Sequence, residues 1–347
     1  MSTEIKPQKP WQLSTRELAY PFFILATSAL ASFLTVLGTP MNGKLAFAFL
    51  FFIFSTVSMY VYKFRILGKQ AAIDSIASSI ALTGALIVFA PVVSILVTTI
   101  IKGLPGLHLS LFTDTMFSAS YLDPIDKGGL LHAIVGTLYL IILSIIISVP
   151  MGILSALYLT EIKGPGSKFI QFTVQAMSGV PSIVAGLFIL SSLIYPVTKE
   201  LSGLMGSLAL TILMIPTIAR TSEEMLLLIS NELREAGVAL GGTQWRTVAG
   251  VVLPAARSGL VTAIILGIAR IIGETAPILL VSGGGDAVNL NPAEGAMGSL
   301  PYYIWKAFLT GGTPEAFARA WAGMLVLLAF IFILFGLARY LSGRKVA

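Results

Sequence analysis

The chain has 347 residues, of which 56% are hydrophobic and only 11% are charged. Soluble domains carry roughly 25% charged residues, so this composition excludes a soluble globular protein and indicates an all-α, polytopic membrane bundle. In such a protein the formal net charge of +6 is no sign of nucleic-acid binding, because the location of each basic residue decides its role. The sequence has no cysteine, which excludes disulfides, thiolate metal sites and a cysteine nucleophile.

The first 19 residues are polar, and an apolar run of about 18 residues begins at Tyr20. The run ends in Gly38-Thr39-Pro40 without a small-x-small cleavage site, so we expect an uncleaved first span and not a signal peptide. Ser14 and Glu17 have the spacing of a capping box, which predicts a helix start just before the membrane.

Hydropathy predicts eight spans, because about 20 apolar residues cross the hydrocarbon core as a helix. Several of the predicted spans contain proline, and we expect kinks at Pro91, Pro150, Pro181 and Pro216. The predicted spans cover residues 20–37, 45–62, 76–101, 130–159, 169–195, 203–219, 257–281 and 320–341.

The distribution of lysine and arginine predicts the orientation of the chain. With both termini in the cytoplasm, fifteen of the 22 basic residues lie on the cytoplasmic side and six lie outside. This bias follows the positive-inside rule and predicts that the segment after residue 219 is cytoplasmic. Two long outside segments are expected, at 102–129 and 282–319. Residues 282–290 of the second segment are expected to form a flexible loop, and a cap at Thr313 predicts that a helix begins at Pro314.

The cytoplasmic segment Glu235 to Pro254 has the pattern of two helices separated by a break. Gly241-Gly242 is expected to end the first helix, because glycine tolerates the left-handed conformation at a helix C-terminus. A short amphipathic piece through Trp245 and Val248 should follow, with Pro254 at the start of the next span. One face of the first helix is expected to carry Met225, Ile229, Leu233, Ala236 and Leu240.

Two charged residues lie well inside the seventh predicted span, apart from Arg257 at its inner end. Arg270 and Glu274 are four residues apart and would share a helix face. A charge costs roughly 2.5–3.5 kcal/mol at mid-span on an insertion scale, so such residues pair with each other or face a water-filled path. Because arginine stays charged, we favour an anion path over a purely structural ion pair. Arg220, at the inner end of the sixth predicted span before a second capping box (221–224), has the position of an ordinary membrane anchor.

Sequence patterns of catalysis are missing. The chain has no Gly-x4-Gly-Lys-Ser/Thr phosphate loop, so we expect it not to bind ATP by that route. Its two histidines form no metal-binding pair, and no Gly-x-Ser-x-Gly motif of an intramembrane serine protease is present. We therefore expect no catalytic residue, cofactor or metal site in this chain.

The cytoplasmic hairpin resembles the EAA loop of ABC-importer permeases, the segment that contacts the ATPase in that family. The resemblance maps this loop to about residues 220–256. Gly237 stands where the family usually has alanine, and Val251 where it usually has isoleucine. The matching positions are Glu235, Ala236, Gly237, Gly241, Val251, Leu253 and Pro254.

Within that family, further runs resemble the PstA-type phosphate permeases. The resemblance covers roughly residues 75–342 and implies a six-span permease core, preceded by an extra two-span hairpin (1–74) and followed by a short tail (343–347). It also maps the family's functional residues to Arg220, Arg270 and Glu274. The runs are GVPSIVAGLF (179–188), IPTIARTSEEML (215–226), LREAGVALGGTQWRTVAGVVLPAARSGL (233–260), ARIIGETAPIL (269–279), SLPYYIW (299–305) and AWAGMLVL (320–327).

The resemblance implies a multi-pass protein of a bacterial-type inner membrane, acting with other subunits. These are two copies of a separate ATPase, a PstC-like second permease or a second copy of this chain, and a phosphate-binding protein. Transport would proceed by alternating access. Two alternatives stay open: an importer of another oxyanion such as sulfate, molybdate or a phosphonate, and a membrane subunit that senses phosphate supply without lining the path.

Overall fold

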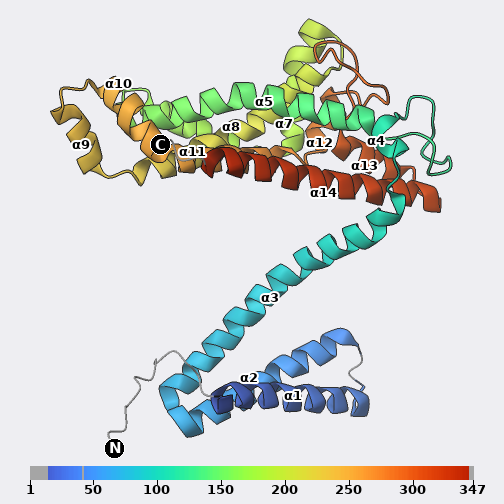
Figure 1. Ribbon diagram of the computed structural model, residues 1–347, viewed down its shortest axis with the longest axis vertical. Helices are drawn as coiled ribbons and strands as arrows, with labels where there is room; N and C mark the ends of the chain where they lie inside the picture. Colours follow the sequence, from blue (N-terminus) through green and yellow to red (C-terminus); the bar gives the residue numbers. More distant parts are fainter. Residues whose placement is uncertain (1–14, 41–42, 344–347) are drawn as a thin grey trace, which may run out of the picture. The chain divides into compact units, whose positions relative to one another are not determined.

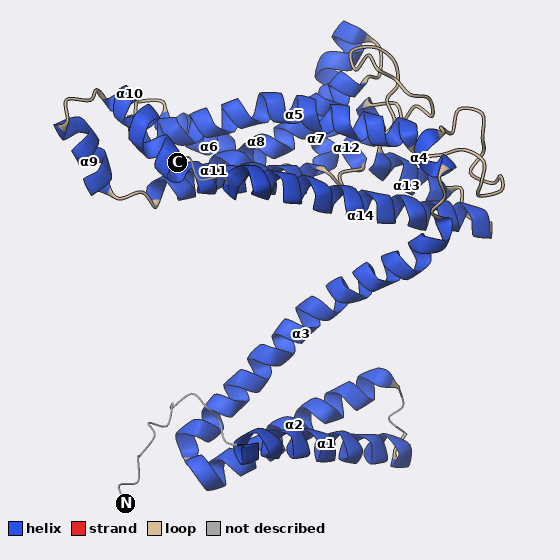
Figure 2. Cartoon of the chain, viewed as in Figure 1, coloured by secondary structure: helices blue, strands red, loops and turns tan. Residues whose placement is uncertain are grey.

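The computed structural model describes residues 15–40 and 43–343, and Ser14 of the first predicted capping box lies outside these ranges. Within the described ranges every regular element is helical, and one isolated bridge joins Gly283 to Met297 (Figure 2). The predicted all-α class is confirmed. The contacts divide the chain into two units, residues 1–96 and 97–347, and each is described by itself.

The first unit contains a helical hairpin and most of a third helix. Helix α1 (Thr15–Gly38) and α2 (Lys44–Leu67) pack together, with the rings of Tyr20 and Tyr62 5.6 Å apart. No residue of α2 is buried, as expected for a helix whose side chains face lipid. Helix α3 (Lys69–Gly103) continues into the second unit. Both the predicted domain boundary after residue 74 and the division after residue 96 fall within α3.

The second unit is a bundle of long helices with short helices at its two ends. Figure 1 shows α5, α8, α11 and α14 running along the bundle, with α9 and α10 at one end and α4 and α13 at the other. Its helices are α4 (Ser110–Thr113), α5 (Leu131–Leu157), α6 (Ser167–Ser178), α7 (Ser182–Ile189), α8 (Gly203–Leu227), α9 (Asn231–Ala239), α10 (Gln244–Thr247), α11 (Leu253–Ile271), α12 (Ala276–Val281), α13 (Leu300–Leu309) and α14 (Pro314–Gly343). A 3₁₀ turn, η1 (Leu104–Gly106), and three π-helical turns, η2 (Tyr158–Ile162), η3 (Leu190–Thr198) and η4 (Val248–Val252), adjoin them.

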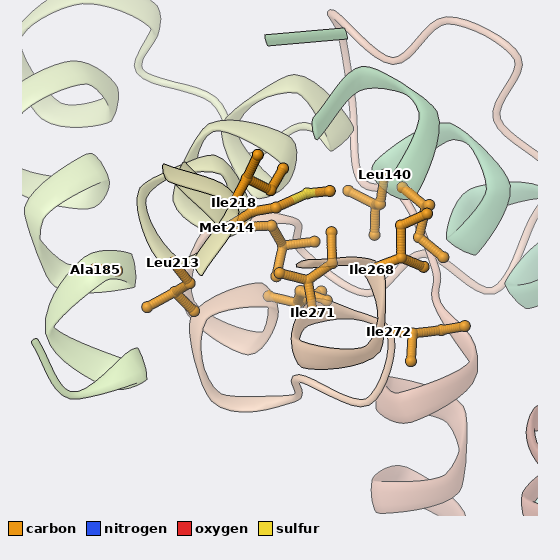
Figure 3. Close-up of a cluster of buried hydrophobic side chains, with 11 residues drawn as sticks. Leu140, Ala185, Leu213, Met214, Ile218, Ile268, Ile271 and Ile272 are labelled. Atoms are coloured by element: carbon orange, nitrogen blue, oxygen red, sulfur yellow. The ribbon is translucent and has the colours of Figure 1, made fainter. Parts of the chain in front are cut away.

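Helix α8 lies at the centre of this bundle. In its most apolar stretch 72% of the residues are buried, compared with 39% or less in the other candidate spans of the described chain. Small residues allow α11 to approach closely, since a Cβ atom at Gly267 would lie 2.9 Å from Ile218 Cγ1. Figure 3 shows the resulting core, where Met214 and Ile218 of α8 meet side chains of α5 and α11 (Leu140, Ile268 and Ile271).

Seven described helices are long and apolar enough to span a membrane, and an eighth span is counted if α6 and the α7–η3 helix form one broken span. The helices flanking the break bend by 108°, so Pro181 interrupts the fifth predicted span and does not merely kink it. Proline lacks an N–H and disfavours helix at the preceding residue, which accounts for the break. Pro91, Pro150 and Pro216 lie inside unbroken helices. The seventh predicted span is also interrupted, because α11 ends at Ile271.

The predicted outside segment 282–319 is more ordered than its composition suggested. It contains α13, whose first turn is capped by Ser299 Oγ accepting from the Tyr302 N–H at 3.4 Å. The stretch predicted to be a flexible loop is held at Ser282, whose hydroxyl donates to the Met297 carbonyl at 2.6 Å. The predicted helix start is confirmed, since Thr313 caps α14 by accepting from the Ala316 N–H.

Candidate functional site

The hairpin predicted from the sequence is present as α9, a break and α10. Ser230 caps α9 by accepting from the Leu233 N–H, and Thr243 caps α10 by accepting from the Arg246 N–H, each at 3.4 Å. Gly241, with φ of +83°, lies in the break. That φ favours glycine, so the prediction that Gly241-Gly242 ends the helix is confirmed.

Three boundaries around the hairpin differ from the predictions. Helix α8 runs without interruption to Leu227, so residues 221–224 lie inside it and form no capping box. The helix then stops and restarts at the Ser230 cap, which separates Met225 and Ile229 from the apolar face of α9. After the break, α10, η4 and α11 form one continuous helix, and Pro254 follows the π-helical turn within it.

The hairpin presents an exposed apolar surface that no part of the described chain covers. Leu240 is 90% exposed, and Trp245, Val238 and Leu233 are exposed beside it. Glu235 and Ala236 are exposed as well, whereas Leu253 packs partly against the small cluster under the hairpin and Pro254 is exposed. Large exposed apolar side chains on a polar segment are typical of a protein-binding surface.

Gly237 has a different role from its neighbours. A Cβ atom at this position would lie 2.5 Å from Thr247 Cγ2, so the glycine allows α9 to pack against α10.

Next to α9 lies a pocket of about 880 Å³, lined mainly by residues of α9, α10 and the π-helical turn η2 that follows α5. Two of its lining residues, Glu161 and Arg234, form an ion pair at 2.9 Å. Sequence reasoning missed this pair, because Glu161 lies 73 positions before Arg234 and its own neighbourhood has no motif that points to the hairpin. The one available signal was an acidic residue at the end of an apolar span.

Of the two arginines predicted near the substrate path, Arg220 belongs to α8 and Arg270 of α11 contacts α8. Arg270, in the last turn of α11, has an exposed side chain whose Nη1 donates to Thr217 Oγ1 of α8 at 3.3 Å. Arg220 lies three residues after Thr217, on the same face of α8, and is partly exposed. Its Nη1 lies 3.9 Å from Glu223 Oε2, a distance too long for a hydrogen bond.

Glu274 does not share a helix face with Arg270, contrary to the prediction. Helix α11 ends at Ile271, and Glu274 lies in the turn that follows, where its N–H donates to the Ile271 carbonyl. No ion pair within 4 Å joins these two described residues. The guanidinium of Arg270 lies in the last turn of α11, where the negative end of the helix dipole stabilises a positive side chain.

Helix α7, which follows the Pro181 break, packs against α12, the short helix that follows the end of α11. A Cβ atom at Gly186 of α7 would lie 2.8 Å from the Cα atom of Pro277 of α12, so the helices that follow both breaks are in direct contact. Helix ends leave backbone N–H and C=O groups without helical partners, and in membrane proteins such breaks are tolerated where they line a polar cavity. Arg270 and Glu274 flank one of these breaks.

The opposite end of the bundle is held by a buried arginine. Arg319 of α14 is fully buried and donates to the carbonyls of Lys127, Asp123 and Pro124 at 2.7, 3.0 and 2.6 Å. Burial raises the pKa of the neighbouring Tyr303 to about 12, so this phenol stays neutral beside the guanidinium.

The described chain combines a bundle of apolar helices, one span broken between α6 and α7, and an exposed hairpin, which fits the class of membrane permeases of transport systems. The family model for the binding-protein-dependent transport system inner membrane component matches residues 148–346. The chain belongs to this family, and it is a multi-pass membrane protein.

Among its relatives is the phosphate transport system permease protein PstA 1 of Mycobacterium tuberculosis strain CDC 1551 / Oshkosh. It is 40% identical over 222 residues, which cover 63% of this chain and 73% of the relative. PstA of Pasteurella multocida is 37% identical, covering 72% and 88%, and PstA of Xylella fastidiosa strain Temecula1 is 35% identical, covering 80% and 94%. The chain is also similar to the inward-facing MetNI methionine ABC transporter, with TM-score 0.46 and 23% identity over 60% of this chain and 88% of that one.

Proposed function

We propose that this chain is the membrane-spanning permease subunit of an ATP-driven importer of inorganic phosphate. The observation that carries the proposal is the match to relatives named as phosphate transport permeases, at 35–40% identity over 73–94% of their lengths. The fold adds an exposed hairpin, one broken span, and Arg270 at the end of α11, which has no carboxylate partner among the described residues.

ATP hydrolysis belongs, in this proposal, to a separate ATPase present in two copies. The apolar surface around Leu240 and Trp245 supports a docking role, because it is exposed although it lies on a polar segment. Glu235, Ala236, Gly237, Gly241, Leu253 and Pro254 form or support this coupling hairpin. Closure of the ATPases would move α9, and the permease would open alternately toward each side.

The anion path runs, we propose, past Arg270, Arg220 and Glu274. Guanidinium groups bind phosphate through several directed N–H donors, and Arg270 has one nitrogen engaged with the neutral Thr217 hydroxyl. A weak neutral partner leaves the charge free to attract an anion. Glu274 beside the same break would keep the positive potential moderate, so that the anion can also leave.

Both termini are proposed to be cytoplasmic, in a bacterial-type inner membrane. The positive-inside bias supports this orientation, and α14 ends toward the α9–α10 end of its unit (Figure 1). A PstC-like permease and a phosphate-binding protein complete the proposed complex. The binding protein would dock on the α4–α13 end.

The test is reconstitution of the chain with its partner proteins in liposomes, followed by uptake of labelled phosphate. We expect uptake that requires ATP and resists competition by a tenfold excess of sulfate or molybdate. Preferential competition by another oxyanion would assign the same architecture to that substrate. A complex that transports normally after Arg270 is replaced would favour a sensing role, in which this chain does not line the path.

A further inference from the structure

The end of α5 and the hairpin are joined by an ion pair that is well shielded from water. Glu161 lies in the π-helical turn η2, and its side chain is only 7% exposed. Arg234 of α9 donates from Nε to both carboxylate oxygens at 3.1 Å and from Nη2 to Oε1 at 2.9 Å. Charge-assisted contacts of this bidentate kind are among the strongest hydrogen bonds in proteins.

Arg234 also holds the end of α8. Its Nη1 donates to the Ile229 carbonyl at 2.6 Å, and its Nη2 donates to the Leu226 carbonyl at 2.8 Å. The Leu226 carbonyl also accepts from the Ile229 N–H at 3.2 Å, and Ile229 lies just beyond the end of α8, so the guanidinium reinforces the turn that ends this helix. One side chain of α9 therefore contacts the ends of both α5 and α8.

Glu161 contacts the second helix of the hairpin through its backbone. The Gln244 side chain of α10 donates from Nε2 to the Glu161 carbonyl at 2.6 Å. The carboxylate of this residue thus holds α9 while its carbonyl holds α10. Glu161 lies in the π-helical turn η2, and such turns are frequent at functional sites. The turn ends at Ile162, and the next residue, Lys163, has a left-handed backbone with φ of +52°.

These contacts give the hairpin a direct connection to α5 that the chain itself does not provide. Along the sequence, α9 is continuous only with α8 on one side and with α10 and α11 on the other. We propose that Glu161 and Arg234 are positioning residues that transmit movement of α9 to α5. This inference rests on the proposed function above. When the ATPase closes, α5, α8 and α11 would then move together.

The test uses Glu161→Gln in the complete complex in liposomes. This variant keeps the size of the side chain and the carbonyl that binds Gln244, but it removes the negative charge. Arg234→Lys is the second variant, because lysine keeps the charge and loses the planar fork. Glu232→Gln, which changes an exposed carboxylate in the first turn of α9, is the matched control. The readouts are retained ATPase, ATP hydrolysis and labelled phosphate uptake.

We expect Glu161→Gln to retain the ATPase and to hydrolyse ATP within about twofold of the unmodified complex, while uptake falls at least about tenfold. Arg234→Lys should lie between that variant and the control, which should transport normally. The phosphate moved per ATP is decisive, because a mere brace for the hairpin would not lower it selectively.

Two results would overturn the inference alone: unchanged phosphate moved per ATP in Glu161→Gln, or parallel loss of uptake, hydrolysis and bound ATPase in both variants. Absence of ATP-driven phosphate uptake in the unmodified complex would instead overturn the proposed function, and the inference with it.

Discussion

Replacement of Arg319 by methionine tests how the α4–α13 end of the bundle is held. The side chain is fully buried and makes three hydrogen bonds to carbonyls of residues 123–127. A hydrogen bond to a charged group contributes about 1.5–3 kcal/mol, so the three bonds together give an upper limit of about 9 kcal/mol. Methionine retains the apolar contacts of the stem and removes the desolvation cost of the buried charge, and water can reach part of the freed loop. We therefore expect a loss of about 3 kcal/mol.

Thermal unfolding of the purified chain in detergent, followed by near-ultraviolet circular dichroism, measures this loss. With about 2–4 °C per kcal/mol for a unit of this size, the midpoint should fall by about 6–12 °C. Arg246→Met, which changes an exposed arginine, should alter stability by no more than about 0.5 kcal/mol. If the midpoints of Arg319→Met and the control differ by less than about 1 °C, the reasoning about the buried guanidinium is refuted.

Two predictions concern the hairpin. Gly237→Ala should destabilise the packing of α9 on α10 by about 1–3 kcal/mol and weaken retention of the ATPase during purification, because the new methyl group overlaps Thr247 Cγ2. Adding Thr247→Ser should restore much of the retention, because it removes the Cγ2 atom. Gly250→Ala is the control and should have no effect, since no atom lies within 4 Å of its Cβ position. Equal behaviour of Gly237→Ala and Gly250→Ala would contradict the steric argument. Glu235→Lys combined with Gly241→Asp, which strains a backbone at φ +83°, should release the ATPase from purified membranes, and continued co-purification would count against the hairpin as its docking site.

Features encoded over short distances were predictable from the sequence. Apolar runs are long enough to identify the spans, and the Gly241-Gly242 pair marks a backbone position where other residues are strained. The position of the hairpin followed from these local signals. The break at Pro181 was only half predictable, since proline can either kink a membrane helix or end it and the surrounding packing decides between the two.

The contacts that hold the site together were not predictable, because they join residues distant in sequence. Arg270 contacts Thr217, which is 53 positions away, and does not contact Glu274. Helix α11 stops at Ile271, so the further helical turn that would bring Glu274 next to Arg270 does not form. Glu161 and Arg234 likewise meet only in the folded bundle. Helix α13 was missed because its Ser299 cap and short length give a weaker signal than the glycines that precede it.

The most direct test of the proposed function compares the unmodified complex with Arg270→Gln in liposomes. Labelled phosphate is supplied on the side of the phosphate-binding protein, and ATP is supplied on the side of the ATPase. We predict ATP-dependent phosphate uptake by the unmodified complex. The variant should still assemble and hydrolyse ATP, but its uptake should fall to background. Near-normal uptake by Arg270→Gln, in an assembled complex, would contradict the assignment of Arg270 to the anion path.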